Sequence, residues 1–251
     1  MANTMLKKLV LSVAAAAALP AFALNTGDLA FTAFNADEDG WAMVALADVG
    51  ADTQVYFSDN EWDGAAFNTG ESFSSWTSGA SSIAAGTVIR FSKTDNSTLL
   101  AASVGTLARE TVASSTNWGL SATADTLYAY LGTSAAVPTT FLAAISSGTF
   151  GTLVDGSLSN TGLALGAGAI QLKAGSDYAE YSSARSGQTS FADYKTLVSD
   201  VSKWNDLGDG SFTNTVPDTT AFSVTAIPEP ETYALMLVGL AALGMLSRRR
   251  A

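Results

Sequence analysis

The chain has 251 residues, of which 47% are hydrophobic, 10% aromatic and 14% charged, and its formal net charge is -11. This composition is too apolar for a disordered chain, and the length is sufficient for a sizeable hydrophobic core. Cysteine and histidine are both absent, which excludes disulfides, histidine-ligated metals and catalytic triads built on His or Cys. Any catalysis must therefore use carboxylates, Lys, Tyr or Ser.

The first 23 residues have the pattern of a signal peptide. Lys7 and Lys8 precede an apolar run over residues 9–19, and the small residues Ala21 and Ala23 follow shortly after. This run is too short to span a bilayer. A basic start, a short apolar run and an Ala-x-Ala end are typical of an export signal, so we expect signal peptidase to cleave after Ala23. The alternative is a first helix of the core.

Residues 24–226 alternate short β-rich runs with turns rich in Gly, Ser, Thr, Asn and Asp. This texture, with few helical intervals, predicts a single all-β domain that folds as an antiparallel β-sandwich rather than as a parallel α/β sheet. The candidate strands are residues 29–34, 41–46, 54–57, 87–91, 126–130, 140–145, 169–172 and 222–225.

The first third of the domain carries a family resemblance. Residues 27–41 read as an opening strand, an acidic turn and a Trp, and residues 55–62 read as a strand that ends in Ser-Asp-Asn-Glu-Trp. Residues 119–125 and 178–181 fit the same pattern. In these features the chain resembles bacterial secreted proteins with a lamin-tail-like β-sandwich. The resemblance implies an Ig-like interaction domain and supplies no active-site residues.

The turn after the third candidate strand has the spacing of a calcium site. Asp59, Glu61 and Asp63 alternate and are followed by Gly64, and a hard cation requires several oxygen ligands that converge around a tight turn. The closing carboxylate of a complete calcium loop is one residue late, at Glu71. The alternative is a hairpin turn, because Asp-Gly is common there. Ca2+ is the one cofactor that the residues suggest.

Several aromatic residues have an expected place in the sandwich. Trp41 and Tyr56 lie within candidate strands and are expected to be buried. Trp62, Trp76 and Trp118 lie in Gly- and Ser-rich segments, where exposed rings could stack on sugars. Their alternative role is to close the ends of the sandwich.

One segment has helical periodicity. Apolar residues follow Phe191 at spacings of three and four, and Ser190 with Asp193 three positions later resembles a capping box. We therefore expect one short helix near residues 191–203, with its aromatic stripe packed in the core.

The C-terminus combines three features in a fixed order. Pro228, Glu229 and Pro230 precede an apolar stretch over residues 233–246, which Arg248, Arg249 and Arg250 follow. As a helix the stretch would measure about 21 Å, which is short against a hydrocarbon core of roughly 30 Å. In this order of motif, apolar helix and Arg cluster, residues 227–251 resemble the bacterial PEP-CTERM sorting signal. A plain membrane anchor at the tail is the alternative.

The PEP-CTERM resemblance implies a pathway for the protein. It implies export across the inner membrane of a Gram-negative exopolysaccharide producer, transient insertion of the C-terminal helix with the arginines in the cytoplasm, and processing by an exosortase. The mature protein would be released or attached at the cell surface.

The domain between the two signals is strongly acidic. The signals contain five of the 12 basic and two of the 23 acidic residues, so residues 24–226 have a net charge of -14. Such a surface repels nucleic acid and anionic lipid. We therefore expect a non-enzymatic extracellular or surface matrix protein that interacts with exopolysaccharide or other biofilm components. The alternative is an exopolysaccharide-active glycoside hydrolase or lyase that uses paired carboxylates.

Overall fold

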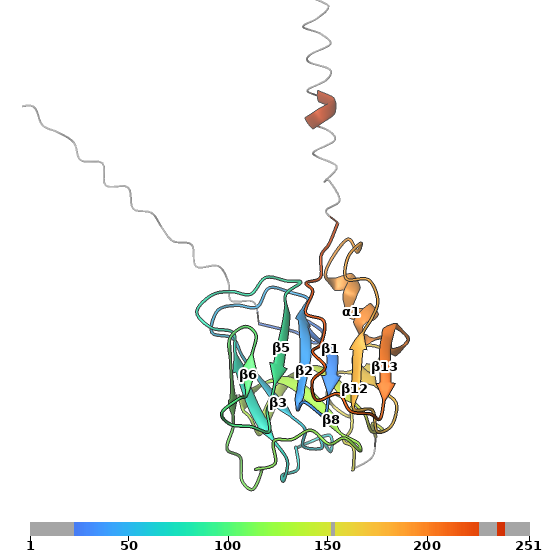
Figure 1. Ribbon diagram of the computed structural model, residues 1–251. Coiled ribbons are helices and arrows are strands. Elements are labelled where there is room, and N and C mark those ends of the chain that lie inside the picture. The colour runs from blue at the N-terminus through green and yellow to red at the C-terminus, as the bar shows by residue number, and fades with distance from the viewer. Residues whose placement is uncertain (1–22, 152–153, 226–234, 239–251) are drawn as a thin grey trace, which may run out of the picture.

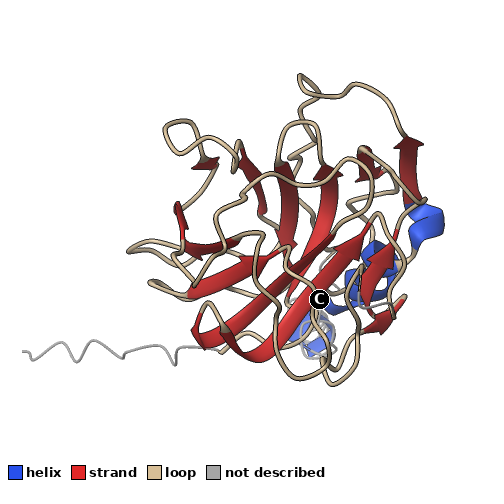
Figure 2. Cartoon of the chain, turned by 90° about the horizontal axis from the view of Figure 1, so that it is seen from below, coloured by secondary structure: helices blue, strands red, loops and turns tan. Residues whose placement is uncertain are grey.

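A computed structural model describes residues 23–151, 154–225 and 235–238. Their regular secondary structure is mostly β-strand and forms two sheets (Figure 1). Side chains of both sheets contribute to a shared core. Seen from below, strands fill the body of the domain and the helical segments lie to one side (Figure 2). Most of the predicted signal peptide and most of the C-terminal sorting segment lie outside the described residues.

The first sheet has six strands in the order β13-β12-β1-β2-β5-β6, and every neighbouring pair is antiparallel. Its strands are β1 (Leu29–Asn35), β2 (Gly40–Ala45), β5 (Val88–Ser92), β6 (Ala101–Ala102), β12 (Tyr178–Tyr181) and β13 (Trp204–Gly208). We call the end where β1 passes into β2 the lower end, and the end where β2 stops and β5 starts the upper end, as drawn in Figure 1.

The second sheet has seven strands in the order β10-β11-β9-β8-β3-β4-β7. Its strands are β3 (Gln54–Ser58), β4 (Phe73–Thr77), β7 (Thr106–Arg109), β8 (Thr126–Ser134), β9 (Val137–Ser146), β10 (Ala164–Leu165) and β11 (Gly168–Gln171). The β11–β9 and β10–β11 pairs are parallel. This sheet is therefore mixed, which differs from the purely antiparallel sandwich expected from the sequence.

Seven of the eight predicted strands are present, and the exception is the segment at 222–225. Val224 there forms only an isolated bridge with Gln188. The sequence predicts a strand here because apolar and polar residues alternate. The segment, which contains the buried Phe222, crosses the sheet instead of joining it.

The helix predicted near residues 191–203 is present but shorter than predicted. Helix α1 (Ala192–Ser199) is followed by a 3-10 turn, η1 (Val201–Lys203), because Asp200 between them has an extended backbone and breaks the α-helix. One half of the predicted capping box is formed, since the Ser190 N–H donates to the Asp193 carboxylate at 2.9 Å. Tyr194 and Val198 are fully buried, so the stripe packs in the core as expected.

The core confirms the predicted burial of two aromatic residues. Trp41 is 2% exposed and Tyr56 is 8% exposed. The Trp41 ring lies 4.9 Å from the ring of Phe57 in the opposite sheet and 5.3 Å from that of Phe91, measured between centroids. The contact joins the two sheets.

The outer face of the first sheet is covered by residues 209–225, which we call the C-terminal strap (Figure 1). At the lower end, the Asn35 side chain donates to the carbonyl oxygens of Phe212 and Thr215, both at 3.1 Å. At the upper end, the Phe222 N–H donates to the Gly86 carbonyl at 2.8 Å. Because the strap crosses this face, every residue of β1 is buried.

Residues 235–238 form one exposed helical turn. Within the part of the chain that the structure describes, no helix is both long enough and apolar enough to cross a membrane.

Candidate functional site

The residues of the predicted calcium loop do not converge on one point. Asp59 turns inward after β3, where its Oδ1 accepts hydrogen bonds from the Ser72 N–H at 2.6 Å and the Ser72 hydroxyl at 2.7 Å. The Glu61 carboxylate accepts a hydrogen bond from the Asn68 side chain. Across the residues described, no group of three or more acidic side chains is placed to hold a metal ion.

Asp63 has a local structural role instead. Its Oδ1 accepts hydrogen bonds from the N–H groups of Ala65 at 2.7 Å and Ala66 at 2.8 Å, and its side chain thereby closes the turn. These bonds lower the pKa of Asp63. The hairpin-turn alternative describes this segment, in which the chain reverses and Trp62 forms a bridge with Phe67.

The inward turn of Asp59 places it in a buried acidic cluster with Glu71 and Asp125. Asp59 is 1% exposed and Asp125 is 6% exposed. Asp59 Oδ2 and Glu71 Oε2 are buried without a hydrogen-bond partner. The ion pairs found among the described residues join other groups, so no basic side chain neutralises this cluster.

Burial changes the acidity of all three groups. It raises the pKa of Asp59 to about 7, with Glu61 adding a smaller increase, and it raises the pKa of Glu71 to about 8, with Asp59 and Glu61 contributing. Burial also raises the pKa of Asp125, and the charges of Asp59 and Glu71 raise it further. A buried carboxyl group is more stable when protonated, and each negative neighbour strengthens that preference.

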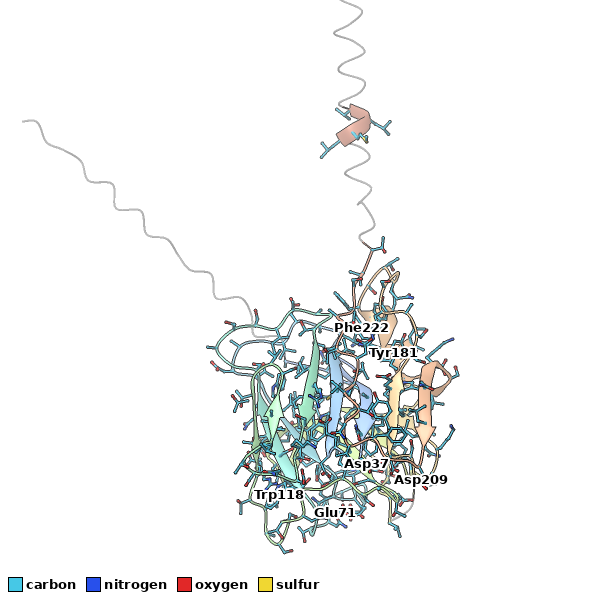
Figure 3. The ribbon with its side chains drawn as sticks, viewed as in Figure 1. Asp37, Glu71, Trp118, Tyr181, Asp209 and Phe222 are labelled. Carbon is cyan, nitrogen blue, oxygen red and sulfur yellow. The ribbon has the colours of Figure 1, made fainter. Side chains whose placement is uncertain are left out.

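Other carboxylates gather at the same lower end, where Figure 3 labels Asp37, Glu71 and Asp209. Burial, and then the charge of Asp95, raise the pKa of Asp39 to about 7. Burial raises the pKa of Asp177, and both Asp37 and Asp209 add to this increase. The lower end is therefore an acidic surface with several carboxyl groups that bind protons near neutral pH.

Two of the three tryptophans expected to be exposed are buried. Trp62 is 6% exposed and donates to the Ser159 carbonyl at 2.8 Å, and Trp76 is 1% exposed and donates to the Val104 carbonyl at 2.7 Å. Sugar stacking by exposed rings is therefore wrong for both, and both rings pack inside the protein. Trp118 is half-buried, and the Arg109 guanidinium lies 4.5 Å from its ring centroid.

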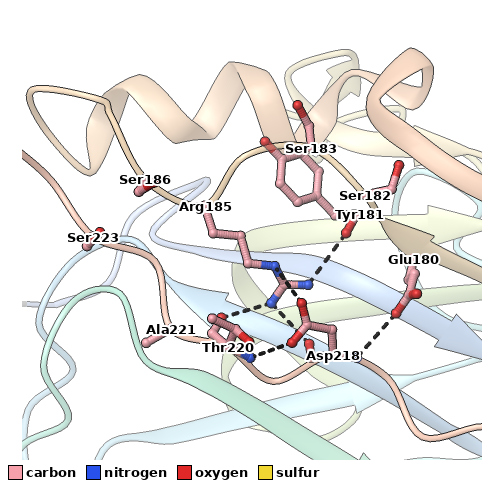
Figure 4. Close-up of a pocket in the computed structure, with 10 residues that line it drawn as sticks. All are labelled: Glu180, Tyr181, Ser182, Ser183, Arg185, Ser186, Asp218, Thr220, Ala221 and Ser223. Carbon is pink, nitrogen blue, oxygen red and sulfur yellow. Dashed lines mark hydrogen bonds and ion pairs between the residues drawn. The ribbon is translucent and has the colours of Figure 1, made fainter.

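A groove of about 470 Å³ lies between β12 and the C-terminal strap (Figure 4). Its lining combines Glu180, Arg185 and Asp218 with a row of hydroxyl-bearing residues, namely Ser182, Ser183, Ser186, Thr220 and Ser223. The groove is open and mostly polar, and it therefore differs from the enclosed, mostly apolar pockets that hold small molecules.

Arg185 organises this groove. Its guanidinium donates to the carbonyl oxygens of Asp218 at 3.0 Å and Thr220 at 2.9 Å, and its Nε lies 3.5 Å from Asp218 Oδ2. The same group lies 5.1 Å from the ring centroid of Phe222. Arg185 therefore fixes the strap against β12.

Both carboxylates of the groove are engaged. Hydrogen bonds from Thr220, together with the charge of Arg185, lower the pKa of Asp218. Glu180 Oε2 accepts hydrogen bonds from the Tyr178 hydroxyl at 2.9 Å and the Asp218 N–H at 3.2 Å. The sequence analysis missed this groove, because it forms between segments that are distant in sequence. An arginine in a Ser-rich turn of a chain with few basic residues was the available signal.

Residues 226–250 match a known protein family, the PEP-CTERM protein-sorting motif. The match begins directly after Thr225, the last residue of the described strap. Neither a curated protein nor a solved structure shows significant similarity to the chain. The C-terminal segment predicted from the Pro-Glu-Pro triplet is thereby confirmed as a sorting motif, and the motif indicates an exported, exosortase-processed protein of a Gram-negative bacterium.

Proposed function

We propose that the sorted protein acts without catalysis in the extracellular matrix or at the cell surface, where it binds exopolysaccharide. The observation that carries the proposal is the PEP-CTERM match at residues 226–250, which directs the domain to the outside of the cell. A lamin-tail-like, Ig-like interaction domain fits the two-sheet architecture. Signal peptidase and exosortase are its processing partners.

The groove supports binding rather than hydrolysis. Glycoside hydrolysis requires one protonated carboxyl group and one free carboxylate. Asp218 is held in its ionised form by Thr220 and Arg185, and Glu180 already accepts two hydrogen bonds. The hydroxyl-rich lining instead suits the hydroxyl groups of a sugar chain.

Charge favours an uncharged polysaccharide. Residues 24–226 have a net charge of -14, and long-range repulsion slows and weakens the approach of an anionic polymer. Arg185, the basic residue of the groove, is already bonded within the protein. We therefore assign a neutral exopolysaccharide as the ligand class.

Binding can be tested with purified mature protein and a neutral exopolysaccharide from the native host in isothermal titration calorimetry. Ser186→Trp fills the groove and should raise the dissociation constant by about tenfold or more. Ser114→Trp, at an exposed turn away from the groove, is the matched control and should leave it unchanged. Equal affinities for the two variants would exclude the groove as the binding site.

One observation favours the alternative of a carboxylate-dependent hydrolase or lyase. Glu71 has a pKa raised to about 8 beside Asp59, and a general acid must be protonated near neutral pH. A reducing-sugar assay on the same polymers distinguishes the two functions. Release of sugar that Glu71→Gln abolishes would establish the enzyme, and binding without release supports the matrix protein.

A further inference from the structure

The C-terminal strap remains part of the fold up to its last described residue. The Thr225 N–H donates to the Gln188 carbonyl at 2.8 Å, and the Ser223 N–H donates to the Arg185 carbonyl at 2.8 Å. The Tyr194 hydroxyl donates to the Ser223 carbonyl at 2.9 Å, and Phe222 is 3% exposed. The folded domain therefore delivers the chain to the sorting segment at a fixed point on the upper end.

The chain between this point and the apolar segment is short. Seven residues, 226–232, separate Thr225 from Tyr233, and seven fully extended residues reach at most about 25 Å. Strand β9 has ten residues, so the sandwich is roughly 33 Å tall at about 3.3 Å per residue. A connection of this length cannot pass along the whole domain to bring the lower end to a membrane.

Charge gives the upper end no affinity of its own for an anionic surface. Asp48 lies in one of its loops, Asp193 lies in the first turn of α1, and Asp28 pairs with Lys195 at 2.6 Å. Any approach to a bilayer must therefore be imposed by the connection to residues 233–246 and not by electrostatic attraction.

We propose that, while residues 233–246 are in the membrane, the domain stands on its upper end, with the loops at 46–53 and 79–87 facing the lipid headgroups. The acidic lower end, with Glu71 and Asp37, then faces away from the bilayer. This inference rests on the membrane insertion that the proposed sorting route requires, and it adds the surface that meets the lipid.

The absence of cysteine from the chain allows a direct test with single-cysteine variants of the full chain. Ala51→Cys and Ser81→Cys place a fluorophore at exposed positions of the upper loops, and Ser114→Cys and Asn117→Cys place it at exposed positions of the lower end. Each labelled variant is reconstituted, without exosortase, into phosphatidylcholine vesicles that contain headgroup-linked energy acceptors. Thermal unfolding verifies that each variant keeps the parent fold.

The upper labels should be quenched severalfold more strongly than the lower labels, equally at about 0.05 M and about 0.5 M salt, because the constraint is the connection and not charge. Insertion of an about 20-residue Gly-Ser segment after Thr225 should reduce the difference, since a flexible linker lets the domain turn. Equal quenching of upper and lower labels in the chain without the insertion would overturn the orientation.

Vesicle flotation separates this result from a failure of the sorting route. A chain that floats with the vesicles and shows equal quenching contradicts the orientation alone. A chain that does not float contradicts membrane insertion by residues 233–246, and with it the orientation.

Discussion

Asp59 and Glu71 are carboxyl residues whose protons are held more tightly in the folded chain than in the unfolded chain. Their pKa values rise from 3.8 to about 7 and from 4.5 to about 8. Between about pH 4 and about pH 8 the folded chain therefore binds more protons than the unfolded chain. The stability that these bound protons contribute is lost as the pH rises through the folded pKa values. We expect the free energy of unfolding in urea to fall across this range.

Isosteric variants test the origin of this pH dependence. Asp59→Asn and Glu71→Gln imitate the protonated side chains and should flatten the dependence on pH, with the largest gain in stability above pH 7. Asp193→Asn is the control, because Asp193 is an exposed residue with a lowered pKa. A stability that increases from pH 5 to pH 8 would contradict the assignment.

Trp41 offers a second test at the scale of one residue. Its ring packs against both Phe57 and Phe91, which also contact each other, and removal of such a buried ring in Trp41→Ala should cost about 3 to 5 kcal/mol of unfolding free energy. The Trp41 Nε1 has no hydrogen-bond partner, so Trp41→Phe should cost much less. Chemical denaturation measures both, and a loss below about 1 kcal/mol for Trp41→Ala would mean that the ring does not hold the sheets together.

The sequence was sufficient to predict the burial of large aromatic residues within candidate strands, as at Trp41 and Tyr56. It was insufficient for the acidic loop. The spacing of Asp59, Glu61 and Asp63 suggested convergence, but Asp59 follows a strand into the interior while Asp63 closes a local turn. Which way a carboxylate points depends on Ser72 and Asp125, which only the tertiary fold brings near.

Among the elements, the C-terminal strap should contribute more to stability than its lack of regular structure suggests. Phe222 lies 5.6 Å from Tyr181 and 5.0 Å from Tyr194 between ring centroids. Phe222→Ala should therefore cost about 3 to 5 kcal/mol of unfolding free energy. Val216 lies in the same strap but is 63% exposed, so Val216→Ala should change the stability by less than about 0.5 kcal/mol. Equal effects of the two variants in urea denaturation would show that the strap is not seated.

Some of the elements that the sequence did not reveal depend on partners that are distant along the chain. Strand β4 reads as Phe-Ser-Ser-Trp-Thr, and its serines are buried because β3 and β7 flank it on both sides. The parallel β11–β9 pair has no local signature, because parallel pairing depends on a crossover connection and not on a turn. The helix was recognised because its periodicity is local.

For the whole molecule, intact-mass analysis of protein from the native host tests the processing at both ends. The mature chain should start at Leu24, which is 3% exposed and is the first residue of the core. Its C-terminal residue should lie beyond Thr225, because the strap is hydrogen-bonded up to that residue. The mature chain should lack Arg248, Arg249 and Arg250. Extracellular protein that retains the apolar tail would contradict processing by exosortase.

The long-range closure of the first sheet has a consequence for the order of events during export. Strand β1 pairs with β12 through residues such as Ala33 and Glu180, which are 147 positions apart, and the C-terminal strap seals this pair from outside. A chain that crosses the membrane from its N-terminus presents the β1–β2 pair first, and the other edge of β1 must stay unpaired until β12 and then the strap have emerged. Contacts this distant form slowly. Phe222 lies only 11 residues before Tyr233, so we expect the strap to be the last part of the domain to seat, after nearly the whole chain has emerged.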